Sequence, residues 1–446
     1  MTRTPSIYIG IDLGTSGVRA CAINHDKAIL TLCKTPLPAP IKDGRSITQD
    51  ANLWWQATEK VVTDLLSQIN AHKVNAISVN GTSGTVLVCD AKGAPLAPAR
   101  MYNDSFCSEQ AMQIKSIAPS QSAAHGACSG LAKLLFLQTQ FPQARHIVHQ
   151  ADWIVGKLCG HFDITDENNA LKSGYDPRTP RSQVTGSQTT GWPDWLKQLN
   201  VNMKLMPQVV APGTPIATIC DGLFNQLNLN PHCQIVSGTT DSIAAFIATG
   251  ASKPGDAVTS LGSTLVLKVI SEQAVFAPQS GIYSHKLGDY WLAGGASNTG
   301  GAVLAHYFDQ QEIDNLTNLL TPEKPTDLNY YPLLNAGERF PINDPDLPPR
   351  LEPAANTQLE FFQGILEGIS QIELQGYSKL KQLGAAFPSQ VETTGGGSKN
   401  KAWQQIRQSI LGVPVRRAEF NEACYGSALL ARQGMINTER QPTPVD

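Results

Sequence analysis

The sequence predicts an α/β protein with two domains, and three observations support this prediction. Short apolar runs of strand length are followed by longer amphipathic runs, and tight turns join some of the strands into antiparallel hairpins. The chain has 446 residues, enough for two large domains or for about three of ~150 residues. A similar turn follows a strand in each half, as Leu13-Gly14-Thr15-Ser16 and as Leu261-Gly262-Ser263-Thr264.

The N-terminal region opens with strands and a helix. A glycine-rich turn and Asn24-His25-Asp26 join the first strands, and Asp50 is expected to cap the helix that follows. That helix is amphipathic, because apolar residues recur every four positions from Leu53 to Leu65. A second pair of strands follows, closed by a tight connection from Asp90 to Gly93. The first three predicted strands cover residues 7–11, 18–23 and 29–33.

A second domain is predicted to begin near residues 232–250, which divides the chain into 1–240 and 241–446. The polar segment 177–195 is expected to be an exposed excursion of the first domain. A helical pattern from 359 to 383 is the longest in the second domain. The strands expected there cover residues 257–261, 265–270 and 290–293.

Composition excludes several classes of partner. The chain is 41% hydrophobic and 16% charged, with a formal net charge of -3 and a pI near 6.3. This balance offers no electrostatic attraction for nucleic acid or an anionic membrane surface. No apolar run reaches the ~20 residues of a membrane span, and no secretory signal is visible. Nine cysteines without a CxxC pair favour reduced thiols in the cytoplasm.

The first turn has the composition of an anion site. A turn without bulky side chains lets the N–H groups of Thr15, Ser16 and Gly17 converge on a phosphate, and Arg19 adds positive charge. Asp12 would repel a phosphate unless Mg²⁺ lay between them, so the turn predicts a metal at Asp12. The alternative is a structural hairpin in which Asp12 caps the turn. The chain has no P-loop, no GxGxxG before a helix and no protein-kinase signature, which excludes those folds.

Two further segments are candidates for chemistry. Asp241 lies between a Gly-Thr-Thr turn and an apolar helix, where it is either a helix cap or a general base for a sugar hydroxyl. Three glycines at 395–397 lie between a strand and a helix, where a flat ring can approach the backbone and Asn400 can bond its edge. The alternative for the glycines is a flexible loop.

Taken together, these segments resemble the FGGY family of carbohydrate kinases over nearly the whole chain. The ordered set of motifs is specific, although each motif alone is weak. The motifs are IDLGTSGVRA, SITQDANLWW, VNGTSGTVLVCD, YND, SGLAKLLFL, SGTTDSIAAF, SLGST, GGASNTGG, YPLLNAGERFP, GGGSKN and GSALLA.

The resemblance implies two ribonuclease-H-like (actin-like ATPase) domains with a catalytic cleft between them, where ATP, Mg²⁺ and a sugar meet. It implies that Asp241 is the catalytic base and that Asp12 is associated with the metal and the substrate. Sugar contacts are expected at Asp12, Ser83, Asp104 and Asp241. The nucleotide contacts that it implies are Thr15, Ser16, Arg19, Gly262, Ser263, Thr264, Gly300, Gly301, Gly396, Gly397 and Asn400, with Trp403 as a wall of the adenosine pocket.

The sugar is harder to assign. Xylulose kinases of the family carry Gln-Met-His-Gly where this chain has Thr82-Ser83-Gly84-Thr85, so their histidine is replaced by Gly84. In the residues of these motifs and in its short length, the chain most resembles the D-ribulose kinases of cyanobacteria and plant plastids. D-ribulose is therefore the expected substrate, with D-xylulose, glycerol or another polyol as alternatives. A different class, an actin-like ATPase that senses a sugar without phosphorylating it, is disfavoured because Asp12 and Asp241 are both present. The expected partners are the sugar and ATP alone, with the chain a monomer or homodimer.

Overall fold

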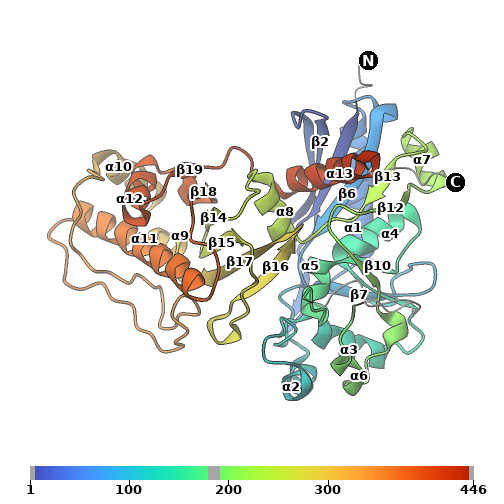
Figure 1. Cartoon of the computed structure of the whole chain (residues 1–446), viewed down its shortest axis with the longest axis horizontal. Helices are drawn as coiled ribbons and strands as arrows, with labels where there is room; N and C mark the ends of the chain where they lie inside the picture. Colours follow the sequence, from blue (N-terminus) through green and yellow to red (C-terminus); the bar gives the residue numbers. More distant parts are fainter. Residues whose placement is uncertain (1–5, 179–190, 441–446) are drawn as a thin grey trace. The chain divides into compact units, whose positions relative to one another are not determined.

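Two six-stranded sheets organise the chain, one in each of two structural units (Figure 1). This computed structural model describes residues 6–178 and 191–440. Contacts divide the chain into unit 1, residues 1–248 with 420–446, and unit 2, residues 249–419. The division therefore falls after Ala248 rather than after residue 240, and the C-terminal segment joins unit 1. Of the segment predicted to be an exposed excursion, residues 179–190 lie outside the described residues.

The main sheet of unit 1 has the strand order β12-β13-β6-β1-β2-β3. Strands β1, β2 and β3 form an antiparallel meander, whereas β6 is parallel to β1 and β13 is parallel to β6. All three predicted N-terminal strands are confirmed, each with slightly longer bounds. The strands are β1 (Ile7–Leu13), β2 (Gly17–Asn24), β3 (Ile29–Pro36), β6 (Val74–Gly81), β12 (Pro215–Thr218) and β13 (Gln234–Val236).

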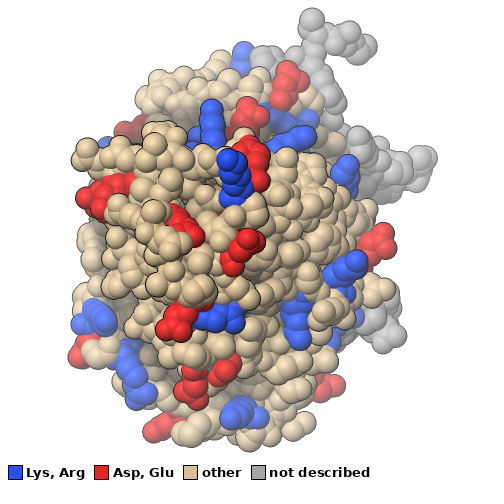
Figure 2. Space-filling model, turned by 90° about the vertical axis from the view of Figure 1, so that its left-hand side faces the viewer, with Lys and Arg blue, Asp and Glu red and all other residues tan. Residues whose placement is uncertain are grey.

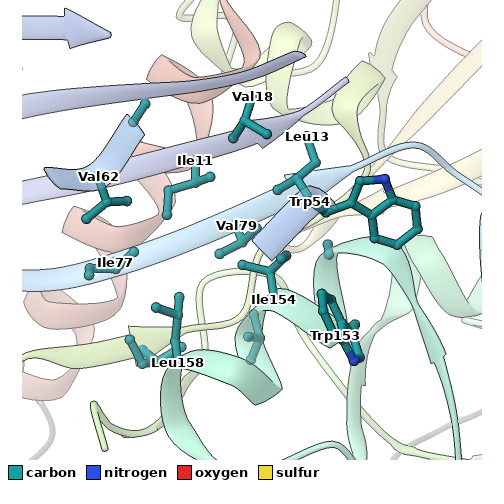
Figure 3. Close-up of a cluster of buried hydrophobic side chains, with 14 of the residues drawn as sticks. Ile11, Leu13, Val18, Trp54, Val62, Ile77, Val79, Trp153, Ile154 and Leu158 are labelled. Atoms are coloured by element: carbon teal, nitrogen blue, oxygen red, sulfur yellow. The ribbon is translucent and has the colours of Figure 1, made fainter. Parts of the chain in front are cut away.

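Helices cover both faces of this sheet, which is why β1 is buried along its whole length. On one face Ile9, Ile11 and Leu13 pack with helices α1 (Ala51–Leu66) and α4 (Gln150–Cys159), and the rings of Trp54 and Trp153 meet edge to face at 6.3 Å (Figure 3). Asp50 caps α1 as predicted, since its carboxylate accepts from the Asn52 N–H at 2.9 Å.

On the other face lie α8 (Asp241–Ala248) and the C-terminal helix α13 (Ala423–Arg440), whose residues pack with Tyr8 and Cys21 (Figure 1). Glycines allow this close approach. A Cβ on Gly10 would lie 1.9 Å from the carbonyl oxygen of Cys424, and one on Gly426 would lie 1.9 Å from that of Ala244. The C-terminal segment belongs to unit 1 because α13 packs in this way.

The rest of unit 1 is built on a five-stranded sheet, with a core of its own. Its strand order is β4-β5-β8-β7-β9, and β10 and β11 form a separate parallel pair. The strands are β4 (Ile41–Asp43), β5 (Ser46–Gln49), β7 (Val86–Cys89), β8 (Ala99–Arg100), β9 (His146–His149), β10 (Ile164–Asp166) and β11 (Gln208–Val210). The helices of this part are α2 (Ser108–Ile117), α3 (Gly130–Gln140), α5 (Glu167–Ala170) and α6 (Trp195–Gln198), whereas α7 (Asp221–Leu227) packs against the core of the main sheet.

The sheet of unit 2 repeats the plan of the main sheet of unit 1. Strands β14, β15 and β17 form an antiparallel meander, β18 is parallel to β14, and β19 is parallel to β18. Each sheet has one edge strand outside this shared plan, which is β16, antiparallel to β17, in unit 2 and β12, antiparallel to β13, in unit 1. The strands are β14 (Asp256–Leu261), β15 (Leu265–Ser271), β16 (Tyr283–Leu287), β17 (Tyr290–Ser297), β18 (Gln390–Thr394) and β19 (Val415–Arg417). The helices are α9 (Gly301–Tyr307), α10 (Gln310–Leu319), α11 (Gln358–Gln382) and α12 (Lys401–Leu411).

The repeated plan agrees with the internal similarity predicted from the two turns, and α11 confirms the long predicted helix. The face shown in Figure 2 has basic and acidic side chains interspersed, without a large area of one sign. Within residues 6–178 and 191–440, no helix is both long and apolar enough to cross a membrane.

Candidate active site

The hairpin of β1 and β2 places Asp12 at the end of the sheet, opposite Arg19. The carboxylate is buried, with the residue only 4% exposed, and its Oδ2 lies 3.2 Å from the Arg19 guanidinium. Arg19 also lies 3.7 Å from Glu422 of the segment that leads into α13. Burial raises the pKa of Asp12 most, the negative charge of Asp241 adds to this effect and Arg19 opposes it, and together they bring the pKa to about 6.

The turn after Asp12 presents two hydroxyl groups. It is closed by a hydrogen bond from the Gly14 N–H to the Gly17 carbonyl at 3.0 Å, and the Ser16 carbonyl accepts from Leu37 at 2.9 Å. Thr15 is half-buried and Ser16 is exposed. Among the described residues, neither hydroxyl has a protein hydrogen-bond partner. Both hydroxyls are therefore available to donate to an anion.

Asp241 lies in the same unit, at the first residue of α8. The preceding turn is tightly packed, because a Cβ on Gly238 would lie 1.7 Å from the Val79 carbonyl oxygen of β6. Thr240 forms a parallel bridge with Gly81, and its carbonyl accepts the first bonds of the helix from Ile243 and Ala244. Asp241 itself is half-buried, and the start of a helix stabilises a negative charge there.

The two aspartates fit a divalent cation. Each carboxylate lies within electrostatic reach of the other, which is unfavourable until a cation separates them. Mg²⁺ is usually held by one or two carboxylates together with phosphate oxygens and water. Within the described ranges there is no group of three or more His, Cys, Asp or Glu side chains that could hold a metal. A cation at Asp12 would accordingly depend on ligands from a bound nucleotide.

Ser83 lies in the loop between β6 and β7, close to two buried threonines. The hydroxyl groups of Thr82 and Thr85 are 2.6 Å apart, and Gln150 accepts from both the N–H and the hydroxyl of Thr82. The Ser83 hydroxyl is itself buried and has no hydrogen-bond partner in the described part of the chain. Ser83 is thus placed as a candidate contact for a polar ligand.

Asp104, the other predicted sugar contact, is completely buried. Its Oδ2 accepts from the Ile47 N–H at 2.8 Å and from Arg100 at 3.0 Å, and its Oδ1 accepts from the Phe106 N–H at 3.2 Å. Both oxygens are occupied by the protein. This geometry favours a role in shaping the loop around 101–106 over direct contact with a sugar.

A buried lysine, which the sequence analysis did not single out, connects these loops. The Lys133 ammonium donates to the carbonyls of Gly84 and Met101, both at 2.7 Å, and to that of Cys128 at 3.0 Å. Burial lowers its pKa to about 8. In the sequence, Lys133 could have been recognised as a charged residue within the apolar helical run SGLAKLLFL. Lys133 therefore fixes the Ser83 loop against two neighbouring segments.

In unit 2, the turn after β14 packs against the start of α9. The Gly301 N–H donates to the Gly262 carbonyl at 2.8 Å, and the Ala302 N–H donates to the Ser263 carbonyl at 3.1 Å. A Cβ on Gly300, whose φ is +146°, would lie 2.7 Å from Thr264. Gly300 and Gly301 thus support the turn from behind, while Ser263 at its tip is exposed.

The triple glycine lies next to the same turn. Gly395 has a φ of +81°, and a Cβ there would lie 2.5 Å from the Leu261 carbonyl oxygen. Gly397 is also closely packed, since its Cβ would lie 2.8 Å from Leu261 and 2.9 Å from Trp403. By contrast, Gly396 is exposed, and a Cβ there would meet no atom within 4 Å. Only the middle glycine of the three offers open backbone to a ligand.

Asn400 and Trp403 hold the helix that follows. Asn400 caps α12 by accepting from the Trp403 N–H at 2.8 Å, and its amide group donates to Thr317 at 2.9 Å. The Trp403 ring is only 1% exposed, and its Nε1 donates to the Leu366 carbonyl at 3.1 Å. This burial favours a role for Trp403 beneath the glycine loop, not as an open wall of a nucleotide pocket.

These features define a class of protein. Two units with the same sheet plan, each with a glycine-hydroxyl turn after its first strand, form the ribonuclease-H-like fold of actin-like ATPases. The FGGY family of carbohydrate kinases matches with its N-terminal domain over residues 7–248 and its C-terminal domain over residues 257–434. The chain belongs to this family, whose members are carbohydrate kinases that use ATP, generally with Mg²⁺.

Individual relatives are distant but cover nearly the whole chain. A xylulose kinase of Staphylococcus epidermidis is 23% identical, over 96% of this chain and 88% of its own. One from Escherichia coli is also 23% identical, over 91% of this chain and 85% of its own. Two crystal structures share the fold. A xyloylose kinase from Brucella ovis has a TM-score of 0.84 and 21% identity, over 97% of this chain and 91% of its own. A glycerol kinase from Plasmodium falciparum with ADP has a TM-score of 0.83 and 17% identity, over 97% of this chain and 90% of its own.

Proposed function

We propose that this chain transfers the γ-phosphoryl group of ATP to D-ribulose, forming D-ribulose 5-phosphate. The observation that carries the proposal is the pair of aspartates, Asp12 and Asp241, beside a turn with two unpartnered hydroxyl groups. A phosphoryl acceptor needs a positioned base, and a phosphate chain needs donors and a cation. Unit 1 supplies a candidate for each of these requirements.

Asp241 acts as the general base in this proposal. Its carboxylate takes the proton of the primary hydroxyl while the sugar oxygen bonds to the γ-phosphorus and the bond from that phosphorus to ADP breaks. Thr15 and Ser16 donate to the phosphate oxygens, and Asp12 would hold Mg²⁺. Mg²⁺, when bound, neutralises charge on the transferring group. Arg19 keeps Asp12 oriented through their 3.2 Å ion pair, which adds a positioning role to the predicted phosphate contact.

The nucleotide contacts of unit 2 are proposed at the exposed parts of its two turns. Ser263 and Thr264 donate to phosphate from the first turn, and Gly396 gives the adenosine an open backbone surface. Close packing at Gly300, Gly301, Gly397 and Trp403 supports these turns, and the carbonyl of Gly262 accepts a hydrogen bond from the Gly301 N–H. Asn400 contributes through the cap that fixes the start of α12.

D-ribulose is proposed over D-xylulose because of the loop at 82–85. Gly84 stands where xylulose kinases of the family carry histidine, and its φ is +87°. A histidine would be strained in this conformation, and Lys133 holds the carbonyl of Gly84 in place. The names of the relatives favour a second candidate, D-xylulose. Both sugars are ketopentoses, so the choice between them is a question of stereochemistry.

An ADP-release assay with D-ribulose, D-xylulose, L-ribulose, glycerol or no sugar tests the proposal. We expect the highest kcat/KM with D-ribulose. A higher value with D-xylulose would select the second candidate. ADP release that no sugar increases would instead indicate an ATPase without kinase activity and would overturn the proposal.

A further inference from the structure

Near Asp241, unit 1 buries polar atoms that have no hydrogen-bond partner in the described ranges. Gln150, the first residue of α4, is completely buried. Its Oε1 accepts from the Thr82 N–H at 2.9 Å and from the Thr82 hydroxyl at 2.7 Å. These two bonds fix the orientation of the amide, because a backbone N–H can only donate. The Nε2 group of Gln150, which carries two donors, is left unpartnered.

Two further unpartnered atoms belong to the same part of the sheet. The Thr240 hydroxyl is buried without a partner, and Thr240 is bridged to Gly81, the residue before Thr82. The Ser83 hydroxyl, one residue after Thr82, is the second. Since Asp241 directly follows Thr240, these donors lie at the same strand ends as the proposed base.

The backbone is adapted to bring Gln150 to this position. A Cβ on Gly81 would lie 3.1 Å from both the Gln150 Oε1 and the Ala151 nitrogen, so glycine there gives α4 room to approach. A buried donor without a partner is costly, and such groups are rare in native proteins. Three of them beside a candidate base indicate that a ligand completes their hydrogen bonds.

Another buried glutamine of unit 1 shows the usual arrangement. Gln49 is 2% exposed, and its amide is bonded at both ends. Its Nε2 donates to the Pro38 carbonyl at 2.7 Å, and its Oε1 accepts from Trp54 at 2.7 Å. The unpartnered Nε2 group of Gln150 is therefore not a general feature of buried glutamines in unit 1.

We propose that the Gln150 carboxamide and the Thr240 hydroxyl, together with Ser83, bind hydroxyl groups of the acceptor sugar. This inference rests on the proposed function, since it requires a polyhydroxylated acceptor next to Asp241. The Gln150 Nε2 group donates to sugar hydroxyl oxygens, and the Thr240 hydroxyl donates or accepts. A site built to bond a substrate hydroxyl discriminates strongly against analogues that lack it. Gln150 and Thr240 thus determine which sugar is accepted.

Two substitutions test the proposal. Thr240→Val removes an unpartnered hydroxyl at constant shape, and Gln150→Glu keeps an oxygen that can accept from Thr82 but removes the amide donors. For each we expect the KM for D-ribulose to rise about tenfold or more, the value of one lost hydrogen bond of about 1.4 kcal/mol, with the KM for ATP unchanged. We also expect the rise in Tm that D-ribulose gives the wild-type protein without ATP to be lost.

Matched controls separate ligand binding from folding. Thr240→Val should leave the Tm of the sugar-free protein unchanged or higher, because no protein bond is lost. Gln49→Glu should lower that Tm and leave the KM for D-ribulose unchanged. If an internal water, and not the sugar, bonds the Gln150 Nε2 group and the Thr240 hydroxyl, the KM for D-ribulose stays at the wild-type value in both site variants. This outcome would overturn the inference. A wild-type protein inactive with every sugar of the panel would instead overturn the proposed function.

Discussion

The two six-stranded sheets have the same plan, but their strand ends carry different chemistry. In unit 1 the first hairpin carries Asp12 two residues before Gly14, whereas in unit 2 the corresponding position before Gly262 is Ser260. In unit 1, the strand parallel to the first one is β6, which ends at Gly81 and is followed by buried threonines. In unit 2, the corresponding strand is β18, which is followed by three glycines. One scaffold therefore presents carboxylates and hydroxyl groups in unit 1, whereas in unit 2 the corresponding positions offer hydroxyl groups and nearly bare backbone without the carboxylate.

We infer from this difference a separate task for each unit. Carboxylates can hold a cation and take a proton, but they cost folding free energy when buried. Glycine backbone can approach a planar ring or a phosphate closely, yet it cannot take a proton. Unit 1 is suited to the acceptor and the chemical step, and unit 2 is suited to the nucleotide.

The largest effect is expected at the proposed base of unit 1. Asp241→Ala should lower kcat with D-ribulose by 10²–10⁴-fold, about the contribution of a positioned general base, and leave ADP binding intact. Steady-state kinetics and calorimetric titration with ADP measure the two quantities. Ser242→Ala, at the neighbouring exposed position, is the control and should retain wild-type kcat. Wild-type turnover in Asp241→Ala would remove the aspartate from the mechanism.

Asp12→Ser makes the unit 1 hairpin resemble that of unit 2. We expect kcat/KM to fall about 10²-fold, since one electrostatic element of the transition state is lost. The stability of the folded protein should instead increase. The folded-state pKa of about 6 lies above the ordinary 3.8, so the folded protein binds the extra proton and loses stability as the pH rises through this window.

The shift corresponds to about 3 kcal/mol at neutral pH. Removing the charge should therefore raise the Tm of the nucleotide-free protein by several degrees at pH 7.5 and by much less at pH 4.5. Calorimetry at the two pH values measures this difference. A fall in Tm at pH 7.5 would show that the ion pair with Arg19 outweighs the burial of Asp12.

The same pKa predicts a pH dependence of activity. Because protonated Asp12 cannot hold a cation, kcat/KM of the wild-type protein should fall about tenfold per pH unit below pH 6. The residual activity of Asp12→Ser should lack this dependence, which assigns the ionisation to Asp12. If kcat/KM fell in the same way below pH 6 in both proteins, the ionisation would belong to another group.

The sequence was most informative where a backbone pattern determines the structure. Short apolar runs and tight turns predicted the antiparallel meanders of both sheets, β1 to β3 and β14, β15 and β17. The similarity between Leu13–Ser16 and Leu261–Thr264 predicted the common plan of the two sheets. The return of α13 to unit 1 could not be predicted, because it depends on contacts between Gly10 and Cys424, which are far apart in the chain.

Side-chain roles that depend on partners were also beyond the sequence. Asp104 and Trp403 have residue types suited to ligands, and only the structure shows that Ile47, Arg100 and Leu366 already bond their polar atoms. Gln150 gave no signal, because an unpartnered amide can be recognised only when every neighbour is known.

The smallest effect is expected in the glycine loop of unit 2, where neighbouring positions separate support from contact. Gly395→Ala forces a side chain into a left-handed conformation 2.5 Å from a carbonyl oxygen, so it should lower the Tm as well as weaken ATP binding. Gly396→Ala meets no protein atom, so it should leave the Tm unchanged and raise the KM for ATP by about three- to tenfold if nucleotide lies against it. The KM for D-ribulose should stay constant in Gly396→Ala, since that glycine belongs to the unit that does not carry the proposed base. If Gly396→Ala had the wild-type KM for ATP, the adenosine would lie away from this loop. The proposed assignment of the nucleotide to unit 2 would then be wrong.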